Sequence, residues 1–324
     1  MKVLVVGGAG YIGSVTVDQL LRSGHGVVVL DSLVSGHREA VNADAEIVVA
    51  DVRAEDVLAR LMASHSFEAV VYYAGYIQAG ESVVNPGRYF ANNVGGCIAL
   101  LNAMVAYGVR RFVFSSSAAV YGEPDEVPIR EDAPLRPVNP YGEGKLMVER
   151  MLPWYETQGI SYASLRYFNA AGASDRRGED HRPETHLIPI VLQAAAGQRD
   201  AVPLYGSDYP TPDGTCIRDY VHVSDLAAAH VLALERPDAP SGAYNLGNGI
   251  GFSNRDVIEA ARNVTGKQVA VREEPRRPGD PARLVASSER AKEALGWTPG
   301  FTELEAIVES AWRWHEGHPK GYST

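Results

Sequence analysis

Cysteine is scarce in this chain of 324 residues, and its spacing excludes several classes of protein. The two cysteines, Cys97 and Cys216, lie far apart and form no CxxC motif. A disulfide framework and a cysteine zinc site are therefore excluded, and both thiols are interpreted as packing residues in a reducing compartment. The nine histidines form no HExxH or similar motif, so the sequence predicts no metal site.

Long hydrophobic runs and an excess of positive charge are also missing. No stretch of eighteen apolar residues occurs, and glycines break the apolar start KVLVVGGAG too early for a signal-peptide core. These absences predict a cytoplasmic protein without a membrane span. The formal net charge of −10 opposes extended contact with nucleic acid or an anionic membrane, so an anionic ligand would be small and bound by local cations.

The first half of the sequence alternates strand patterns with helix patterns. Short β-branched and apolar runs are separated there by segments of helical length. Continuous apolar strands of this kind are typical of a parallel sheet covered on both faces, which predicts a doubly wound α/β domain of the Rossmann type. The expected strands are 2–6, 26–31, 45–51, 69–75, 111–117 and 161–169.

The second half has a looser pattern, which predicts a smaller C-terminal α/β domain for the substrate. Residues 171–189 and 205–220 are rich in glycine, proline and polar side chains, and loops this long usually cover a ligand. We therefore divide the chain into a dinucleotide-binding domain at 1–170, to which later segments return, and a mainly substrate-binding domain at 171–324. The later segments expected are helices at 253–266, 287–296 and 303–317 around a basic loop at 272–284.

A glycine motif directly follows the first expected strand. Gly7, Gly10 and Gly13 have GxxGxxG spacing in GGAGYIG and precede a helical stretch. Glycines there allow the backbone to approach a pyrophosphate, whose charge the helix N-terminus stabilises. Asp31 ends the second strand, where a carboxylate binds an adenosine ribose and repels a 2′-phosphate, so NAD is favoured over NADP. Asp51, at the end of the third strand, lies either against the adenine or in a surface turn.

A tyrosine and a lysine stand one helical turn apart in the stretch NPYGEGK. If a helix begins near Pro140, Tyr141 and Lys145 share a face and point into the cleft over the cofactor. A tyrosine base at pH 7 requires the phenolate to be favoured by about 4 kcal/mol. Lys145 and the oxidised nicotinamide ring both supply positive charge for this purpose. Ser117, at the end of the strand RFVFSSS, adds a hydroxyl to the proton path.

Several longer stretches resemble a known family along nearly the whole chain. They include GGAGYIGS, NNVGG, FSSSAAVYGEP, NPYGEGKLMVE, LRYFNAAGA, YGSDYPTPDGTCIRDYVHVSDLA and RRPGDPA. The chain resembles the extended short-chain dehydrogenase/reductases and, among them, the family of UDP-glucose 4-epimerases, for which the stretch from YGSDYPTPDGT to RDY is the most specific. The resemblance implies an NAD-dependent 4-epimerase of a UDP-hexose, with tightly bound NAD and a homodimeric assembly.

The resemblance also implies roles for individual side chains. Tyr141 would be the base, Lys145 would hold the nicotinamide ribose and tune Tyr141, and Ser117 would lie beside the sugar 4-hydroxyl. Tyr141 would take the 4-hydroxyl proton while the C4 hydride passes to NAD, and the transient 4-keto sugar would turn over before the hydride returns. Asn92 and Tyr121 would lie near the active site or the cofactor. The implied cofactor-binding residues are Gly7, Gly10, Tyr11, Ile12, Gly13, Asp31, Asp51, Val52, Ala74, Gly75, Asn92, Ser115, Tyr141, Lys145 and Tyr167. The implied substrate-binding residues are Ser117, Tyr141, Asn169, His186, Leu187, Tyr205, Arg218, Arg277 and Asp280.

Four positions depart from the family pattern or leave it open. Tyr72 replaces a usual histidine, and Ile77 stands where some members carry a lysine at the cofactor phosphates, which leaves the firmness of NAD retention open. Leu284 aligns with a position that limits the size of the sugar's substituent. Arg283 is either a surface residue or a partner for a C6 carboxylate. The glucuronate and N-acetylglucosamine series therefore remain alternatives to UDP-glucose and UDP-galactose.

Other functions on the same fold are disfavoured by specific residues. A sugar-nucleotide dehydratase carries an Asp-Glu pair after a strand-end threonine, where this chain reads Ser117-Ala118-Ala119. A non-catalytic dinucleotide sensor typically lacks the Tyr-Lys pair, and a net dehydrogenase would exchange NAD in every cycle. For the expected homodimer, the stretches 85–108 and 145–159 carry enough apolar residues to form a helix bundle.

Overall fold

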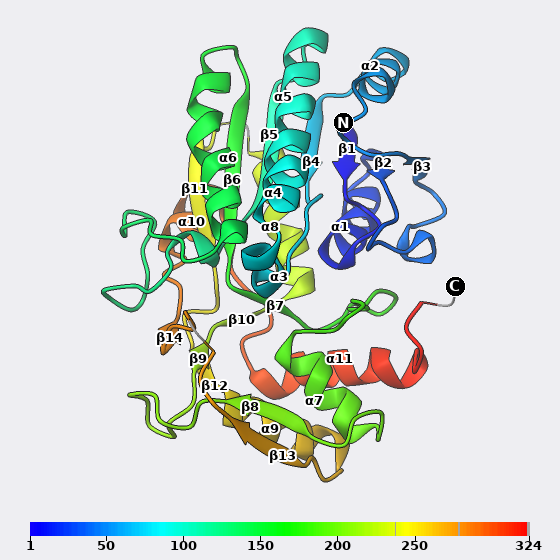
Figure 1. The fold of residues 1–324 in the computed structure, drawn as a ribbon. Helices are drawn as coiled ribbons and strands as arrows, with labels where there is room; N and C mark the ends of the chain where they lie inside the picture. The colour runs from blue at the N-terminus through cyan, green and yellow to red at the C-terminus, as the bar shows by residue number, and fades with distance from the viewer. Residues whose placement is uncertain (237, 278, 323–324) are drawn as a thin grey trace.

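The computed structural model describes residues 1–236, 238–277 and 279–322, and a large parallel sheet forms its centre (Figure 1). The seven strands have the order β11-β6-β5-β4-β1-β2-β3, and every neighbouring pair is parallel. The direction of winding reverses beside β1, which is the point where doubly wound sheets bind ligands. The strands are β1 (Lys2–Val6), β2 (Gly26–Asp31), β3 (Glu46–Val49), β4 (Ala69–Tyr72), β5 (Arg111–Ser117), β6 (Ser161–Tyr167) and β11 (Gly242–Leu246).

The predicted doubly wound sheet is confirmed, and all six predicted strands form. The strands β3, β4 and β6 end two or three residues earlier than the apolar runs suggested. The seventh strand, β11, comes from the second half of the chain and pairs with β6. Its sequence GAYNL is short and weakly patterned, so the pairing with β6 depends on tertiary structure.

The two faces of the sheet bury alternate residues of each strand, because successive side chains of a strand point to opposite faces. Val3 and Val5 of β1 pack with one set of helices, and Leu4 and Val6 pack with the other. The first face is covered by α1 (Tyr11–Arg22) and α8 (Val223–Glu235), and the second by α2 (Glu55–Ser64), α5 (Gly95–Tyr107) and α6 (Pro140–Glu156).

One helical stretch, Pro86–Tyr107, has the length and composition of a membrane span, with 22 residues and a mean hydropathy of 1.2. It consists of α4 (Pro86–Tyr89), the π-helical turn η2 (Phe90–Val94) and α5. Leu100, Leu101 and Met104 of α5 are 0 % exposed and belong to the core beneath the sheet. Helices in a protein core can have the same length and composition, and packing on the sheet accounts for the apolar residues of this helix.

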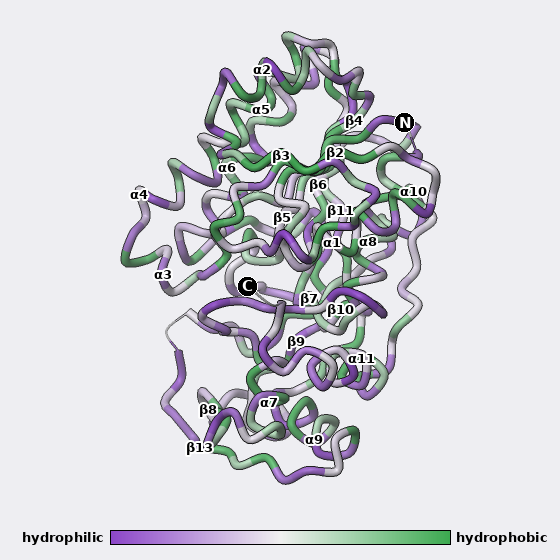
Figure 2. The backbone as a smooth tube through the Cα atoms, turned by 90° about the vertical axis from the view of Figure 1, so that its right-hand side faces the viewer, coloured by the Kyte–Doolittle hydropathy of each residue, from purple (hydrophilic) through white to green (hydrophobic). Residues whose placement is uncertain are grey.

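The remaining elements form a second layer of structure beyond the carboxyl edge of the sheet, at the opposite end from α2 (Figure 2). Three helices there share a hydrophobic core with short strands. The helices are α7 (Leu187–Ala195), α9 (Asn254–Thr265) and α11 (Leu304–Gly317). The short strands are β7 (Asn169–Ala171), β8 (Val202–Tyr205), β9 (Ile217–Arg218), β10 (Tyr220–His222), β12 (Phe252–Ser253), β13 (Val271–Glu274) and β14 (Arg283–Leu284).

Segments from the second half also return to the large sheet, since α8, β11 and α10 (Glu289–Leu295) all pack there. The three helices expected in the tail form within two residues of their predicted limits, as α9, α10 and α11. The segment 171–189 is mostly loop up to α7, whereas 205–220 and the basic segment 272–284 contribute short strands at their ends. The other short elements are η1 (Arg38–Ala40), α3 (Ala79–Val84) and η3 (Ala118–Val120).

Candidate active site

The turn between β1 and α1 is packed so closely that side chains are excluded from it. Gly7 has a φ of +83°, and a Cβ added there would lie 2.6 Å from the main-chain nitrogen of Ala74. A Cβ on Gly13 would collide with the carbonyl oxygen of Gly7. Gly10 donates its N–H to that same carbonyl over 3.2 Å and stands directly before α1. The turn therefore presents bare backbone and a helix N-terminus at the sheet edge, which suits a pyrophosphate.

Asp31 lies at the same edge and is fixed by main-chain donors. Its carboxylate accepts the N–H of Ala9 over 2.9 Å and that of Leu33 over 2.8 Å. Burial raises the pKa of Asp31, and these two hydrogen bonds oppose that rise. The carboxylate is thus held against the glycine turn, in the place expected for a ribose ligand.

Other predicted cofactor residues have side chains that are already engaged. Asp51 pairs with Arg53 over 2.5 Å at an exposed position, and this hydrogen bond lowers the pKa of Asp51. Val52 beside it is buried. The hydroxyl of Tyr11 donates to the carbonyl of Gly172, so Tyr11 has only its main chain to offer to a cofactor. Ile12 packs, half-buried, against the core of the sheet.

The loop after β4 is held by a side chain that the sequence did not single out. Asn93, 5 % exposed, accepts the N–H of Tyr76 over 2.8 Å and donates to its carbonyl over 2.9 Å. A Cβ on Gly75 would lie 3.2 Å from the Asn93 side chain. The predicted residue Asn92 donates to Asn93 over 3.0 Å. Both asparagines lie in the π-helical turn η2, a feature often found at functional sites and one that sequence periodicity does not reveal.

The Tyr-Lys pair lies in the first turns of α6, as predicted. The side chain of Asn139 caps this helix by accepting the N–H of Gly142 over 2.9 Å, and Pro140 occupies the first turn. The Nζ of Lys145 lies 5.8 Å from the centre of the Tyr141 ring. It donates to the carbonyl of Ser115 over 2.6 Å. The spacing of i and i+4 thus brings the phenol and the ammonium together at the end of β5.

The electrostatics of the pair depend on burial. Burial raises the pKa of Tyr141, and a hydrogen bond with the Ser117 side chain partly offsets the rise. Burial lowers the pKa of Lys145 to about 8. The protein alone therefore keeps the phenol protonated near neutral pH, and Lys145 must be joined by a further positive charge, as the expected nicotinamide ring would provide. Ser117 is in place for proton transfer because its hydroxyl contacts Tyr141.

Two groups of hydrogen-bonded polar side chains are buried near the ends of β5 and β6. Ser115 and Tyr167, on the neighbouring strands β5 and β6, hydrogen-bond to each other through their hydroxyls. Tyr121 donates to Asn245 over 2.7 Å and accepts from Arg166 over 2.8 Å. The hydroxyl of Tyr121 is therefore bonded to side chains of β6 and β11, and these bonds stabilise the ends of the two strands.

The residues predicted for the nucleotide come together from three separate segments. Arg218, 8 % exposed, donates to the carbonyl of Pro281 over 2.8 Å and lies 3.5 Å from the carboxylate of Asp280. The guanidinium of Arg277 lies 3.8 Å from the centre of the Tyr205 ring. Two guanidinium groups, a carboxylate and an aromatic ring provide donors for a diphosphate, an acceptor for a ribose and a face for a base.

Three further predicted residues lie where the second layer meets the sheet. Asn169 begins β7 and bonds through its main chain to the carbonyl of Asp219 over 2.9 Å. His186 and Leu187 begin α7, with His186 at the N-cap and its imidazole directed to Glu179.

Asp219 was missed by the sequence reasoning, although it stands next to Arg218. It is 0 % exposed and accepts main-chain N–H bonds from Asn248 over 2.7 Å, Gly249 over 3.0 Å and Ala286 over 3.1 Å. Burial raises its pKa to about 6, against the effect of these bonds. Asp219 ties two segments, 248–249 and the one that holds Ala286, to β9 and so positions Arg218. The available signal was a second ionisable residue directly after Arg218 in the otherwise apolar and aromatic stretch CIRDYV.

The four positions that depart from the family pattern have different surroundings. Tyr72 is 1 % exposed and packs between Phe112 and Phe114, so it is a core residue. Ile77 is 39 % exposed. Leu284 packs against the small cluster of Ala118, Val120, Tyr121, Ile129 and Leu146, and Arg283 beside it is exposed. Leu284 thus lies between the catalytic strand end and the nucleotide side.

Comparison with known proteins first identifies the family to which the chain belongs. The model of the NAD dependent epimerase/dehydratase family matches residues 3–247, so the chain belongs to this family. Within it, the UDP-glucose 4-epimerase of Halalkalibacterium halodurans is 53 % identical over 100 % of this chain and 98 % of its own. A crystal structure of a UDP-glucose 4-epimerase is 47 % identical, with a TM-score of 0.97 and full coverage of both chains. The Bifidobacterium longum enzyme, solved with NAD⁺ and UDP, is 36 % identical, with a TM-score of 0.94, and covers 99 % of this chain and 100 % of that one. The resemblance to the UDP-glucose 4-epimerases, predicted from the motifs, is confirmed.

Proposed function

We propose that this protein is an NAD-dependent isomerase that interconverts UDP-glucose and UDP-galactose by inverting carbon 4. The observation that carries the proposal is the placement of Tyr141, Lys145 and Ser117 at the end of β5, across the sheet edge from the glycine turn and Asp31. The family match and the named relatives support the same activity.

The residues at the sheet edge suit NAD. The glycine turn has no room for side chains and faces a helix N-terminus, and the Asp31 carboxylate is fixed beside it. Lys145, whose ammonium points to the strand end, would hold the nicotinamide ribose. NAD supplies the group that takes the hydride from carbon 4 and gives it back. We also propose that NAD is retained tightly, although Ile77 provides no positive charge for the cofactor phosphates.

The proton chemistry is assigned to the chain's own side chains. Tyr141 removes the proton of the sugar 4-hydroxyl, Ser117 relays or orients that proton, and Lys145 favours the phenolate. Loss of this proton together with the carbon-4 hydride, which bound NAD would accept, gives a 4-keto sugar. Tyr141 then returns the proton after the sugar has presented its other face. Because the reacting ring must turn, the nucleotide has to carry the binding energy.

The nucleotide is assigned to Tyr205, Arg218, Arg277 and Asp280, with Asn169, His186 and Leu187 nearer the sugar and diphosphate. The glucose and galactose pair is preferred over the N-acetyl and uronate series. Leu284 packs against a hydrophobic cluster, Arg283 beside it is exposed, and the named relatives are UDP-glucose 4-epimerases, which together favour the glucose and galactose pair. We also propose the division into an NAD-binding part at 1–170, with α8, β11 and α10 returning to it, and a mainly sugar-nucleotide-binding part at 171–324.

We propose a homodimer formed by α5 and α6, which lie side by side in Figure 1. Their outer faces expose Ile98 (36 %), Tyr107 (45 %), Met147 (38 %) and Trp154 (74 %). A two-fold dimer would bury these apolar side chains in a four-helix bundle. The change Met147→Glu is expected to shift the protein toward monomer in sedimentation experiments, whereas Val34→Glu, at an exposed apolar site elsewhere, is not.

We propose a cytoplasmic location, because both cysteines and long apolar runs are scarce in the sequence.

The activity is tested with tag-free protein and no added NAD. UDP-glucose, UDP-N-acetylglucosamine and UDP-glucuronate are supplied separately, and NMR detects each 4-epimer. We expect turnover of UDP-glucose first. Tyr141→Phe is expected to lower turnover by roughly 10²- to 10⁴-fold while the purified protein still carries NAD. Tyr155→Phe, on the same helix with its hydroxyl bonded to Asn102, is the matched control. Undiminished turnover in Tyr141→Phe, or no product even with NAD supplied, contradicts the proposal.

A further inference from the structure

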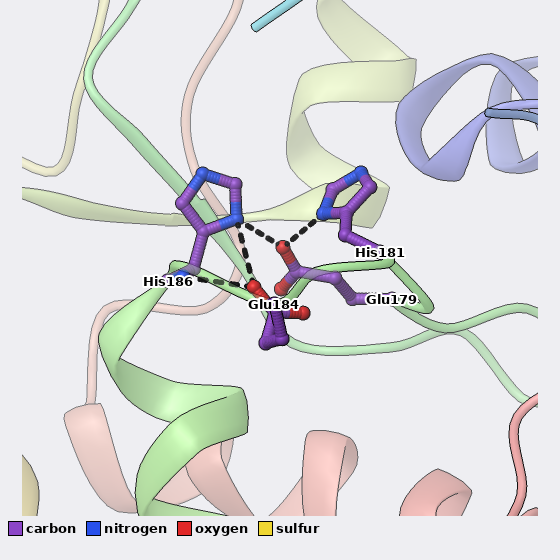
Figure 3. A group of neighbouring side chains, drawn as sticks. All are labelled: Glu179, His181, Glu184 and His186. Atoms are coloured by element: carbon purple, nitrogen blue, oxygen red, sulfur yellow. Dashed lines mark hydrogen bonds and ion pairs between the residues drawn. The ribbon is translucent and has the colours of Figure 1, made fainter. Parts of the chain in front are cut away.

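Two histidines and two glutamates meet in the loop before α7 (Figure 3). We call Glu179, His181, Glu184 and His186 the His-Glu cluster. Figure 3 shows that both imidazoles turn their Nδ1 atoms toward the carboxylates, while their Nε2 atoms point away. The spacing ExHxxExH places all four residues within one short loop. This spacing differs from that of an HExxH motif.

The four potential ligand atoms lie close enough to surround one ion. One atom from each residue can be chosen so that all lie within 4.8 Å of one another. Zinc holds nitrogen and oxygen ligands at about 2.1 Å, so two ligands of one ion are at most about 4.2 Å apart. The Nδ1 of His181 is 3.0 Å from the carboxylate of Glu179, and the Nδ1 of His186 is 3.6 Å from that of Glu184. Small side-chain rotations therefore suffice to close the site.

The two carboxylates of the cluster require positive charge or hydrogen-bond donors beside them. The side chains of Glu179 and Glu184 are only 7 % and 4 % exposed. Within the described part of the chain, the ion-pair partners of these two carboxylates are the imidazoles alone, and no lysine or arginine reaches them. Buried carboxylates are costly unless they are paired or coordinate a metal. Imidazoles that ligate a metal are neutral, so the ligating cluster would carry a charge of about −2, which one divalent ion neutralises.

The surroundings orient the cluster as an outer shell does in metal sites. The carboxylate of Glu184 accepts the main-chain N–H groups of Thr185 over 2.7 Å and of His186 over 2.8 Å. Such bonds to a ligating carboxylate hold it in position and raise metal affinity. The ring of His181 lies edge-on to Tyr11 of α1, with 6.2 Å between the ring centres. The cluster thus joins the loop after β7, the start of α7 and the first turn of the helix at the cofactor site.

We propose that the His-Glu cluster binds one divalent transition-metal ion, with zinc preferred, as a structural link between the second layer and the large sheet. The histidines would ligate the ion through Nδ1, which leaves the Nε2 of His186 for the sugar nucleotide. Imidazole and carboxylate ligands together suit zinc, and four protein ligands leave no open coordination position for catalysis. The ion would hold the loop from Ala173 to His186 closed beside the first residues of α7. This proposal departs from the sequence-based expectation that the protein has no metal.

The test uses full-length, tag-free protein that has been stripped with a chelator and dialysed. Zinc is titrated in competition with a chromophoric chelator, and cobalt is added to a second sample to give a ligand-field spectrum. Thermal unfolding is followed with and without zinc. The variants are His181→Gln and Glu184→Gln. His65→Gln is the control, since His65 pairs with Glu46 over 3.0 Å and belongs to no potential metal cluster among the described residues.

The wild type and His65→Gln are expected to bind one zinc per chain, show the cobalt spectrum of a four-coordinate site and melt several degrees higher with zinc. Each cluster variant is expected to bind at least about tenfold more weakly. If a variant does not fold, the wild-type stoichiometry and the zinc-dependent melting still decide the matter. Less than one zinc per chain, or an unchanged melting temperature, overturns the proposal and means that protons on the imidazoles balance the carboxylates.

Discussion

Replacing Lys145 by methionine tests whether its charge tunes Tyr141. The ammonium lies 5.8 Å from the centre of the Tyr141 ring. At an effective dielectric constant of about 20, two unit charges at that separation attract by about 3 kcal/mol. Loss of this attraction would lower the phenolate population at a fixed pH by roughly a hundredfold. Turnover at neutral pH should fall by a similar factor, and the rising limb of the pH–rate profile should move to higher pH.

The assay is the coupled epimerase rate measured from pH 6 to pH 10, with the NAD content of each preparation determined separately. NAD content separates an effect on the phenol from loss of cofactor. The carbonyl of Ser115 loses its donor in this variant, so thermal unfolding is measured as well. Leu146→Met, at the next buried position of α6, controls for altered packing. A rate that falls by the same factor at every pH, with NAD retained, would show that Lys145 does not tune Tyr141.

Three further predictions concern binding and stability. Arg277→Gln should raise the KM for the UDP-sugar roughly 10- to 100-fold with little change in kcat. The control Arg276→Gln, which removes an ion pair with Asp208, should leave the KM unchanged. Equal effects of the two changes in steady-state kinetics would contradict the assignment of Arg277 to the nucleotide. Tyr72→Phe should leave the free energy of unfolding unchanged or raise it by about 1 kcal/mol in urea titrations, because the buried Tyr72 hydroxyl has no described partner, and a clear loss of stability would refute this. Asp219 has a folded-state pKa of about 6, above its unfolded value, so its contribution to stability is present below about pH 4 and is lost as the pH rises through 6. The wild type should therefore lose on the order of 3 kcal/mol over that range relative to Asp219→Asn, and parallel stability curves would argue against the raised pKa.

Much of the fold follows from local patterns that the sequence displays directly. The strands β1, β2 and β5 match their apolar runs, and α6 begins at Pro140 because an asparagine cap and a first-turn proline favour that start. The glycine turn is equally local, since only residues without a Cβ fit between β1 and Ala74. Tyr141 and Lys145 share a face for the same kind of reason, because they are four residues apart on one helix.

Other features depend on segments that lie far apart in the chain. Asn93 braces the loop after β4 because a π-helical turn rotates it inward, and a periodic pattern cannot reveal that rotation. Asp219 acquires its role only when the segments at 248–249 and 286 fold against β9. The strand β11 joins the sheet through its pairing with β6, although its own sequence is weakly patterned.

The sequence by itself determined the doubly wound class, the cofactor turn, the Tyr-Lys pair and the family, because each depends on residue types at short, fixed spacings. Tertiary structure decided which surroundings those residues meet. Burial sets the direction of the pKa shifts of Tyr141 and Lys145. Long-range packing brings Arg218, Arg277 and Tyr205 together, and it buries Glu179 and Glu184 beside two imidazoles. Charges and contacts of this kind depend on distance in space, which the order of residues does not specify.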